Sequence, residues 1–97
     1  MNKRQLIRTV SDKIQIPEKV TGMVLQAALD TIIESTAKQE DVRLSGFGTF
    51  RRKHRKQRVG RNPLTRAAVI IPEKDIPCFT PGVRLLDAVK RSSPAKG

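Results

Sequence analysis

Lysine and arginine crowd into one short stretch of the chain. Seven of the eleven residues from Arg51 to Arg61 are Lys or Arg, and residues 41–66 carry nine Lys and Arg against one Asp, a net charge of +8. The net charge is only +1 over residues 1–40 and +2 over residues 67–97. So concentrated a charge favours a polyanionic ligand, because each cation can neutralise a phosphate group. The stretch therefore predicts a nucleic-acid site.

Two β-prone runs flank a turn at the end of this stretch. The first covers residues 49–59, the turn contains Asn62 and Pro63, and the second ends at Ile71. A basic run is often only a disordered tail. Here the run after the turn favours an antiparallel ribbon over residues 49–71, whose outer half has too few apolar residues to be buried. We expect an arm, about residues 51–70, that projects into solvent.

Alternation along a strand assigns the cations to two faces of the ribbon. Arg52, His54 and Lys56 share the face of Phe50. The other face carries Thr49, Arg51, Lys53 and Arg55. Successive side chains on one face lie roughly 6.6 Å apart, about twice the rise of a nucleotide along one DNA strand, so such a row can follow a phosphate backbone.

The proline in the turn has two interpretations. Pro63 can simply shape the turn, since its fixed φ suits a reversal of the chain. A rigid apolar ring at the end of a cationic arm can also wedge between base pairs from the minor groove. The pattern alone leaves both open.

Helical periodicity dominates the first 40 residues. Residues 2–14 carry apolar side chains three and four apart, with Asn2 as N-cap and Gln5 completing a capping box. Pro17 suits the first position of a second helix, which runs to about Lys38. That helix is apolar over a wide arc and must be covered on more than one side. Because a chain of 97 residues buries little of its surface, a partner chain is expected to cover it.

The remaining residues predict an α+β fold. Residues 42–45 alternate between apolar and polar types and lead through a tight reversal into the ribbon. Pro72 and Pro77 bracket a short segment expected at a sheet edge, because proline cannot donate to a central ladder. A last helix is expected over residues 82–91, followed by a flexible tail over residues 92–97.

Several classes of protein are disfavoured by the composition. The single cysteine, Cys78, allows no internal disulfide, and His54 is the one histidine, so no zinc-type cluster is expected. No pairing of nucleophile and base, and no phosphate-cradling glycine loop, points to an enzyme, a cofactor or a small-molecule substrate. No apolar run has the length of a secretory signal or a membrane span. We expect a soluble, cytoplasmic protein that is not an enzyme.

A set of motifs resembles one known family. The motifs are Gly46-Phe47-Gly48-Thr49-Phe50, Gly60-Arg61-Asn62-Pro63-Leu64-Thr65, Ile71-Pro72 and Phe79-Thr80-Pro81-Gly82, behind an opening Met1-Asn2-Lys3. Residues 1 to about 91 are similar to the HU and integration host factor family of bacterial nucleoid proteins. The hexapeptide in the turn is a specific motif and stands at the place expected for the family.

The resemblance implies one domain over residues 1–91, with a helical part over 1–40 and a sheet and arm over 41–79. It implies an obligate intertwined dimer whose two β-arms reach around double-stranded DNA through the minor groove, with Pro63 intercalating. The dimer core is expected to hold Phe47, Phe50 and Phe79. The residues expected to contact DNA are Lys3, Gly46, Arg51, Lys53, Arg55, Arg58, Arg61, Asn62, Pro63 and Arg66.

Two departures from the family pattern are visible. Family members commonly have acids in the arm, whereas this chain has Arg51, Arg52, His54, Arg66, Ala67 and Ala68 around those places, so we expect a more uniformly cationic arm. In the last helix Val83 and Leu86 occupy a face that is often lysine-rich in the family, which leaves DNA contacts on that side open.

These observations favour a histone-like, nucleoid-associated architectural protein that bends DNA with little sequence preference, since phosphate contacts and the minor groove carry little sequence information. A sequence-specific bending factor resembling integration host factor is the alternative, and a heterodimer with a related subunit stays open. An RNA-binding protein is disfavoured, because the minor groove of A-form RNA is wide and shallow and the chain has no aromatic platform for unpaired bases.

Overall fold

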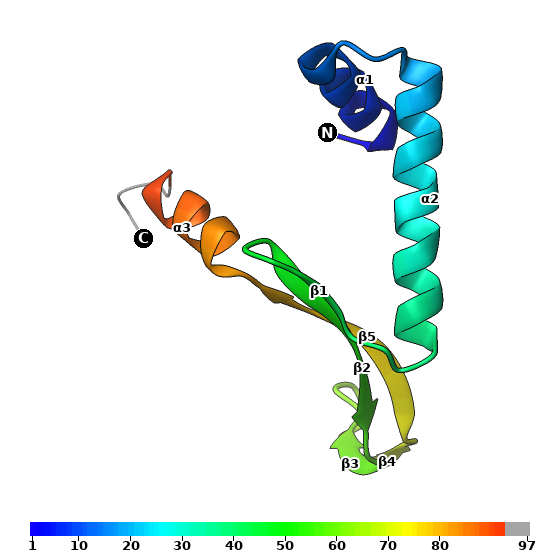
Figure 1. Cartoon of the computed structure of the whole chain (residues 1–97). Coiled ribbons are helices and arrows are strands. Elements are labelled where there is room, and N and C mark those ends of the chain that lie inside the picture. Colours follow the sequence, from blue (N-terminus) through cyan, green and yellow to red (C-terminus); the bar gives the residue numbers. More distant parts are fainter. Residues whose placement is uncertain (93–97) are drawn as a thin grey trace. The chain divides into compact units, whose positions relative to one another are not determined.

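The computed structural model describes residues 1–92 and contains two compact units, Met1–Glu34 and a second that begins at Ser35 (Figure 1). Along the described chain the elements are α1 (Lys3–Ile14), α2 (Glu18–Ala37), β1 (Val42–Leu44), β2 (Gly48–Arg55), β3 (Arg58–Arg61), β4 (Ala68–Ile71), β5 (Lys74–Pro81) and α3 (Val83–Arg91). The predicted α+β class is confirmed. None of the described helices combines the length and the apolar character needed to span a membrane.

The predicted start of α1 is confirmed in detail. The Asn2 side chain accepts a hydrogen bond from the Gln5 N–H at 2.9 Å, and the Asn2 N–H donates to the Gln5 side chain at 3.0 Å. This capping box satisfies two backbone donors at the helix N-terminus. The start of α2 was predicted one residue early: Pro17 precedes the helix, and its carbonyl accepts from the Thr21 N–H at 3.0 Å.

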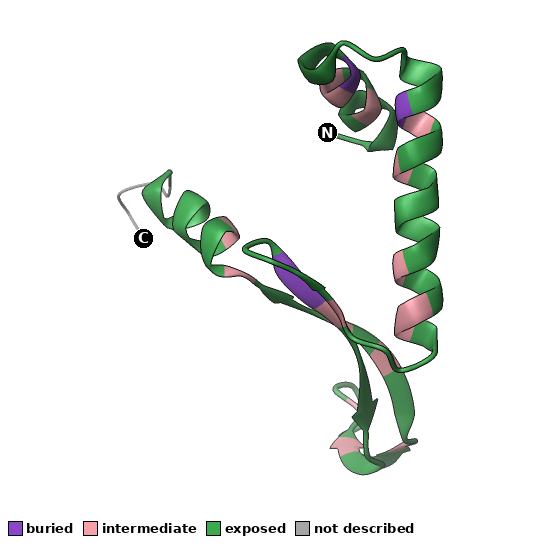
Figure 2. Cartoon of the chain, viewed as in Figure 1, coloured by how far each residue is buried: buried purple, intermediate pink, exposed green. Residues whose placement is uncertain are grey.

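Polar residues hold the turn between α1 and α2. Ser11 and Thr21 are buried, and both hydroxyls donate to backbone carbonyls of that turn, Ser11 to Ile16 and Thr21 to Pro17. Within residues 1–92 no hydrophobic side chain is buried. Figure 2 shows that most of the ribbon is exposed, with only a few buried positions. The apolar side chains of the first unit instead line an open hollow of about 450 Å³. A chain without a buried apolar core lacks the main driving force for folding alone.

The second unit contains a three-stranded antiparallel sheet in the order β1-β2-β5. Gly46, with φ +80°, makes the reversal between β1 and β2. Gly48 lies under the ring of Phe79, where a Cβ atom would come within 2.3 Å of a ring carbon. As predicted, the segment with Pro77 lies at a sheet edge, but the strand is longer than expected and runs on to Pro81.

The predicted pairing of the ribbon is wrong in its inner half. Residues 49–59 were expected to pair with residues 66–71, whereas β2 pairs along its whole length with β5, from Gly48 opposite Pro81 to Arg55 opposite Lys74. Only β3 and β4 pair as expected, with Arg58 opposite Ile71 and Arg61 opposite Ala68. The prolines do not shorten β5, because an edge strand has one side on which no backbone donor is needed.

The last helix begins beside the first reversal of the sheet. The Gly46 carbonyl accepts from the N–H groups of Arg84 and Leu85, at 3.0 and 3.3 Å, and Gly82 N–H donates to the Phe47 carbonyl at 2.8 Å. The bounds of α3, Val83–Arg91, agree with the predicted helix. Of the expected tail, residues 92–97, all but the first lie outside the described residues.

Candidate nucleic-acid interface

Strand register sorts the side chains of the sheet onto two faces. Residues directly opposite in an antiparallel pair share a face, and so do residues two apart in one strand. Because Phe50 pairs with Val42 and Phe79, these three share one face. Arg43, which pairs with Thr49, lies on the other.

The face of Arg43 carries a row of cations, which we call the cationic face. Its members are Arg43, Arg51, Lys53, Arg55 and, from β5, Lys74. Within residues 1–92 the one ion pair made by this face joins Arg51 to Asp41, with Nε to Oδ2 at 3.7 Å and both side chains about half exposed. Arg55 and Lys74 stand directly opposite each other, an arrangement of like charges that costs stability unless an anion lies between them.

The opposite face of the ribbon is not cationic, which corrects the expectation of a uniformly charged arm. Arg52 donates to Asp75 through Nε at 2.9 Å and to the Ala37 carbonyl at 2.6 Å. The two ring nitrogens of His54 lie 2.6 Å from an Asp75 oxygen and 3.1 Å from a Glu73 oxygen. We call Arg52, His54, Glu73 and Asp75 the acid-paired cluster. His54 was expected in a row of cations that follows phosphates. Its ring instead lies within hydrogen-bonding distance of two carboxylates of the same chain.

The acid-paired cluster changes the protonation behaviour of its members. The hydrogen bond to Asp75, and secondarily the one to Glu73, raises the pKa of His54 above its ordinary value of 6.5. The same bond to His54, followed by that from Arg52, lowers the pKa of Asp75 below its ordinary 3.8. His54 and Asp75 therefore each stay charged more readily together than alone.

The tip of the arm is a turn tied together by Asn62. Its backbone N–H donates to the Ala67 carbonyl at 3.0 Å, and its carbonyl accepts from the Arg66 N–H at 2.7 Å. Its side-chain oxygen accepts from the Leu64 and Thr65 N–H groups, at 2.9 and 3.4 Å. Much of the hydrogen-bonding capacity of Asn62 therefore serves the turn.

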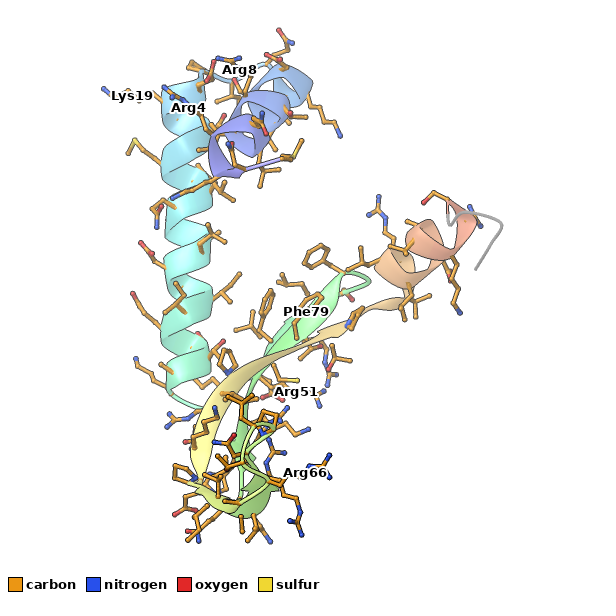
Figure 3. The ribbon with its side chains drawn as sticks, turned by 180° about the vertical axis from the view of Figure 1, so that it is seen from behind. Arg4, Arg8, Lys19, Arg51, Arg66 and Phe79 are labelled. Carbon is orange, nitrogen blue, oxygen red and sulfur yellow. The ribbon has the colours of Figure 1, made fainter. Side chains whose placement is uncertain are left out.

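The arginines around the tip point in different directions. Arg58 and Arg61 are three apart in β3 and so lie on opposite faces of the β3–β4 ribbon. One N–H of Arg61 donates to the Arg66 carbonyl at 3.2 Å, which leaves most of its five donors free. Arg66 has φ +61°, a left-handed conformation, and its side chain is exposed (Figure 3). Pro63 is exposed beside them.

Two other expected DNA contacts already have protein partners. The Lys3 ammonium donates to the side-chain oxygen of Gln26 on α2. The Gly46 carbonyl is bound by α3, so only the rest of its backbone is open to a ligand. The first unit also exposes cations that the sequence reading did not single out, Arg4, Arg8 and Lys19 (Figure 3).

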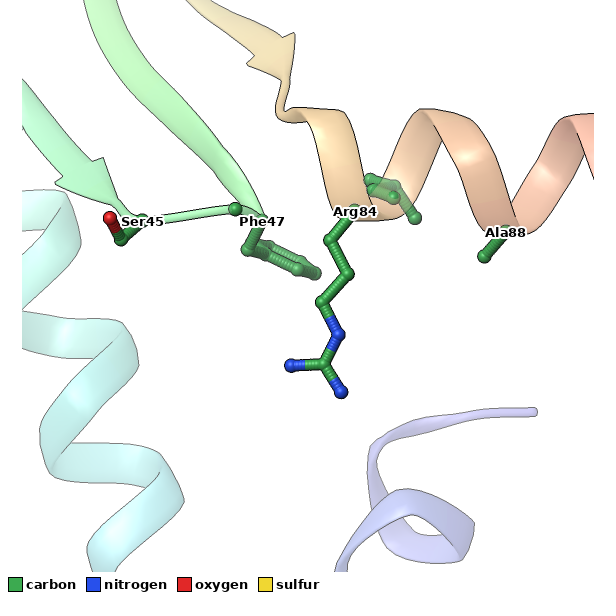
Figure 4. A pocket seen from close by; sticks show the side chains of 6 residues that line it. Ser45, Phe47, Arg84 and Ala88 are labelled. Carbon is green, nitrogen blue, oxygen red and sulfur yellow. The ribbon is translucent and has the colours of Figure 1, made fainter.

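The three expected core phenylalanines do lie together. The ring centroids of Phe50 and Phe79 are 4.8 Å apart, and those of Phe47 and Phe79 are 5.7 Å apart. Phe47 is nevertheless 50% exposed and Phe79 38%. A hollow of about 240 Å³ opens beside Phe47, between the reversal of the sheet and Arg84 and Ala88 of α3 (Figure 4). Such apolar exposure marks a surface built for contact with another molecule.

Two cations of the cationic face, Arg43 and Lys74, were not among the DNA contacts expected from the sequence. Lys74 was not predicted as part of this face because β2 was assigned to the wrong partner strand. For the same reason, the proximity of Glu73 and Asp75 to His54 was not predicted. The available signal was the β-prone run at residues 76–80, which continues the extended chain beyond Pro77. Within the described residues, no group of three or more His, Cys, Asp and Glu side chains is arranged to hold a metal ion.

Comparison with known proteins decides the family. The family model described as bacterial DNA-binding protein matches residues 1–90. The chain belongs to this bacterial DNA-binding protein family. It is 42% identical to the DNA-binding protein HU of Buchnera aphidicola over 91 residues, which cover 94% of this chain and 99% of the relative.

Solved structures of family members agree. An Anabaena HU from a cocrystal with DNA superposes with a TM-score of 0.82 at 39% identity, covering 97% of this chain and all of that one. HU from Thermotoga maritima gives a TM-score of 0.65 at 30% identity, covering 92% of this chain and 98% of that one. The resemblance to the HU and integration host factor family is thereby confirmed, including its fold of helices and antiparallel strands.

Proposed function

We propose that this protein is a histone-like architectural DNA-binding protein. As a homodimer it holds double-stranded DNA in the minor groove, bends it with little sequence preference and so compacts or stabilises the nucleoid. The observation that carries the proposal is the sorting of charge in the β2–β5 ribbon. The cationic face carries Arg51, Lys53, Arg55 and Lys74. The two nearby acids, Asp75 of β5 and Glu73 just before it, instead pair with Arg52 and His54.

This arrangement suits a phosphate backbone. Same-face residues in a strand are roughly 6.6 Å apart, about twice the rise of a nucleotide along one strand of DNA. A phosphate between Arg55 and Lys74 would turn their repulsion into attraction, because both cations could then face one anion. An anionic ligand would therefore stabilise this arrangement of Arg55 and Lys74.

The proposed DNA contacts extend from this face to the tip of the arm. Arg58, Arg61 and Arg66 supply cations around the turn, and Pro63 is the wedge that opens a base step. Asn62 contributes mainly by holding the turn, with its amide N–H₂ available for the groove. Lys3 and the backbone at Gly46 would touch flanking phosphates. We propose that residues 1–91 act as one domain, since the family model spans residues 1–90.

A second copy of the chain is the proposed partner. The apolar hollow of the first unit and the exposed phenylalanines of the second are surfaces that water disfavours. An obligate dimer buries such surfaces in a shared core. A sequence-specific factor like integration host factor is not favoured, because the relatives described above, from Buchnera aphidicola, Anabaena and Thermotoga maritima, are HU proteins. The proposal gives the chain no catalytic role.

Single removal of cations tests the proposal. Lys53→Gln, Arg55→Gln and Lys74→Gln should each reduce the slope of log affinity against log salt by about one unit per subunit, because each residue releases a counterion from one phosphate. Lys13→Gln is the matched control, since it removes a cation that is also exposed from the last turn of α1. Fluorescence anisotropy with a short duplex over a salt series measures the slope.

The expected result is an unchanged slope for Lys13→Gln and a smaller one for the three variants of the cationic face. Equal effects of all four would mean that net charge alone drives binding, which contradicts a defined DNA-binding face. If Lys74→Gln alone left the slope unchanged, Lys74 would not contact a phosphate, and β5 would not be part of the DNA interface.

A further inference from the structure

The turn at the tip of the arm presents a second apolar side chain beside Pro63. Leu64 is 92% exposed, the highest value among the exposed large hydrophobic residues within residues 1–92. A turn at this position makes no demand for leucine, since its backbone needs only an N–H donor there. Nothing in the free chain therefore accounts for a large apolar side chain at the tip.

The turn fixes where Leu64 sits. Its N–H donates to the Asn62 side-chain oxygen at 2.9 Å, and Asn62 is itself held by hydrogen bonds to Ala67 and Arg66. Thr65 closes the other side by accepting from the Ala67 N–H at 3.3 Å. The backbone of Leu64 is thus ordered before any ligand arrives, which lowers the entropy lost when the side chain is buried in a complex.

We propose that Leu64 is a second wedge residue, which enters the base step opened by Pro63 and lies against the unstacked base edge and its deoxyribose. The inference rests on the proposed function. Leucine is among the side chains that minor-groove proteins insert between base pairs, and it carries more apolar surface than a proline ring. The arm would thereby replace more of the lost base stacking than a proline alone can.

Truncation of Leu64 tests this role without disturbing the fold. Leu64→Ala should lower affinity for an intact duplex roughly tenfold for each arm of the proposed dimer, the size expected for burying most of a leucine side chain, and should reduce bending. The loss should be much smaller on DNA with a nick at the binding site, because there the step is already open. The salt slope should not change, since no charge is removed. Leu64→Met, which keeps a large apolar side chain, should retain the affinity and bending that Leu64→Ala loses.

The measurements are energy transfer across a short end-labelled duplex at saturating protein and anisotropy titrations on intact and nicked duplexes. Val59→Ala is the matched control, because Val59 is 71% exposed on β3 but lies outside the turn. Thermal unfolding of free Leu64→Ala should match the parent, since its side chain makes almost no contact in the chain.

Three results would overturn the inference. If Leu64→Ala still bends the duplex fully, Leu64 is not part of the wedge. If Val59→Ala loses as much affinity and bending as Leu64→Ala, the effect is not specific to the tip. An equal loss of affinity on intact and nicked DNA would make Leu64 a general contact rather than a wedge. Pro63→Ala separates this from the proposed function: if that variant also bends the duplex fully, the wedge itself is absent, and DNA binding is then judged by the salt slopes alone.

Discussion

At the scale of single residues, His54 shows how much a neighbour across a strand pair can change. Two carboxylates hold both of its ring nitrogens, so the imidazole is poised to carry a charge although it stands on a basic strand. Its raised pKa means that its contribution to stability is fully present below pH 6.5 and is lost as pH rises through the raised value. Asp75 contributes above pH 3.8 and loses its contribution as pH falls through its lowered pKa. The acid-paired cluster therefore stabilises the ribbon most between pH 3.8 and pH 6.5.

His54 can be titrated directly, because it is the one histidine of the chain. We expect nuclear magnetic resonance of its ring protons to give a pKa above 6.5, with Asp75→Asn lowering it more than Glu73→Gln, since the hydrogen bond to Asp75 is the larger cause. Asp30→Asn, an acid on α2, is a matched control that should leave the value unchanged. A His54 pKa that is the same in the parent and in Asp75→Asn would mean that the two side chains do not meet in solution.

At the scale of elements, local signals were predictable from the sequence and strand partners were not. The start of α1 depends on Asn2 and Gln5, three residues apart, and the turn at the tip depends on Asn62 and its close neighbours. The pairing of β2 depends on β5, whose partner residues lie 19 to 33 positions further along the chain and whose prolines suggested only a short edge strand. The charges on the cationic face were therefore found only in part, and the acids on the other face were missed.

Two glycines test the packing of the elements with opposite expected signs. Gly48→Ala should destabilise the protein by about 1–3 kcal/mol, because its Cβ would lie 2.3 Å from the Phe79 ring and 2.8 Å from the Thr80 carbonyl oxygen. Gly22→Ala in α2 should instead stabilise it by roughly 0.5–1 kcal/mol, since its Cβ would meet Ile7 at an ordinary 3.5 Å. Urea denaturation at one fixed protein concentration measures both. A neutral Gly48→Ala would show that Phe79 moves aside freely.

At the scale of the whole molecule, the chain keeps its apolar residues at its surface. Val24 is 65% exposed, Met23 66% and Ile33 64%, all on α2, and the phenylalanines of the sheet are partly exposed as well. The sequence indicated this indirectly, because α2 is apolar over more of its circumference than α1 can cover. What it could not indicate is which residues face the partner, since that depends on two chains meeting.

Folding and association should consequently be one event. The midpoint of thermal unfolding should rise with protein concentration, by roughly 3–4 °C per tenfold increase for a dimer of this size, because a tenfold change is worth about 1.4 kcal/mol and the unfolding entropy scales with chain length. Val24→Asp, which places a charge in the apolar hollow of the first unit, should abolish both the dimer and the helical signal. Thr31→Asp on α2, outside that hollow, controls for the added acid within the same helix. Circular dichroism over a hundredfold concentration range, with light scattering on the same samples, gives both quantities. A folded monomer at micromolar concentration, or a midpoint independent of concentration, would mean that one chain finds a core by itself, and the exposed apolar surface would then need a partner of another kind.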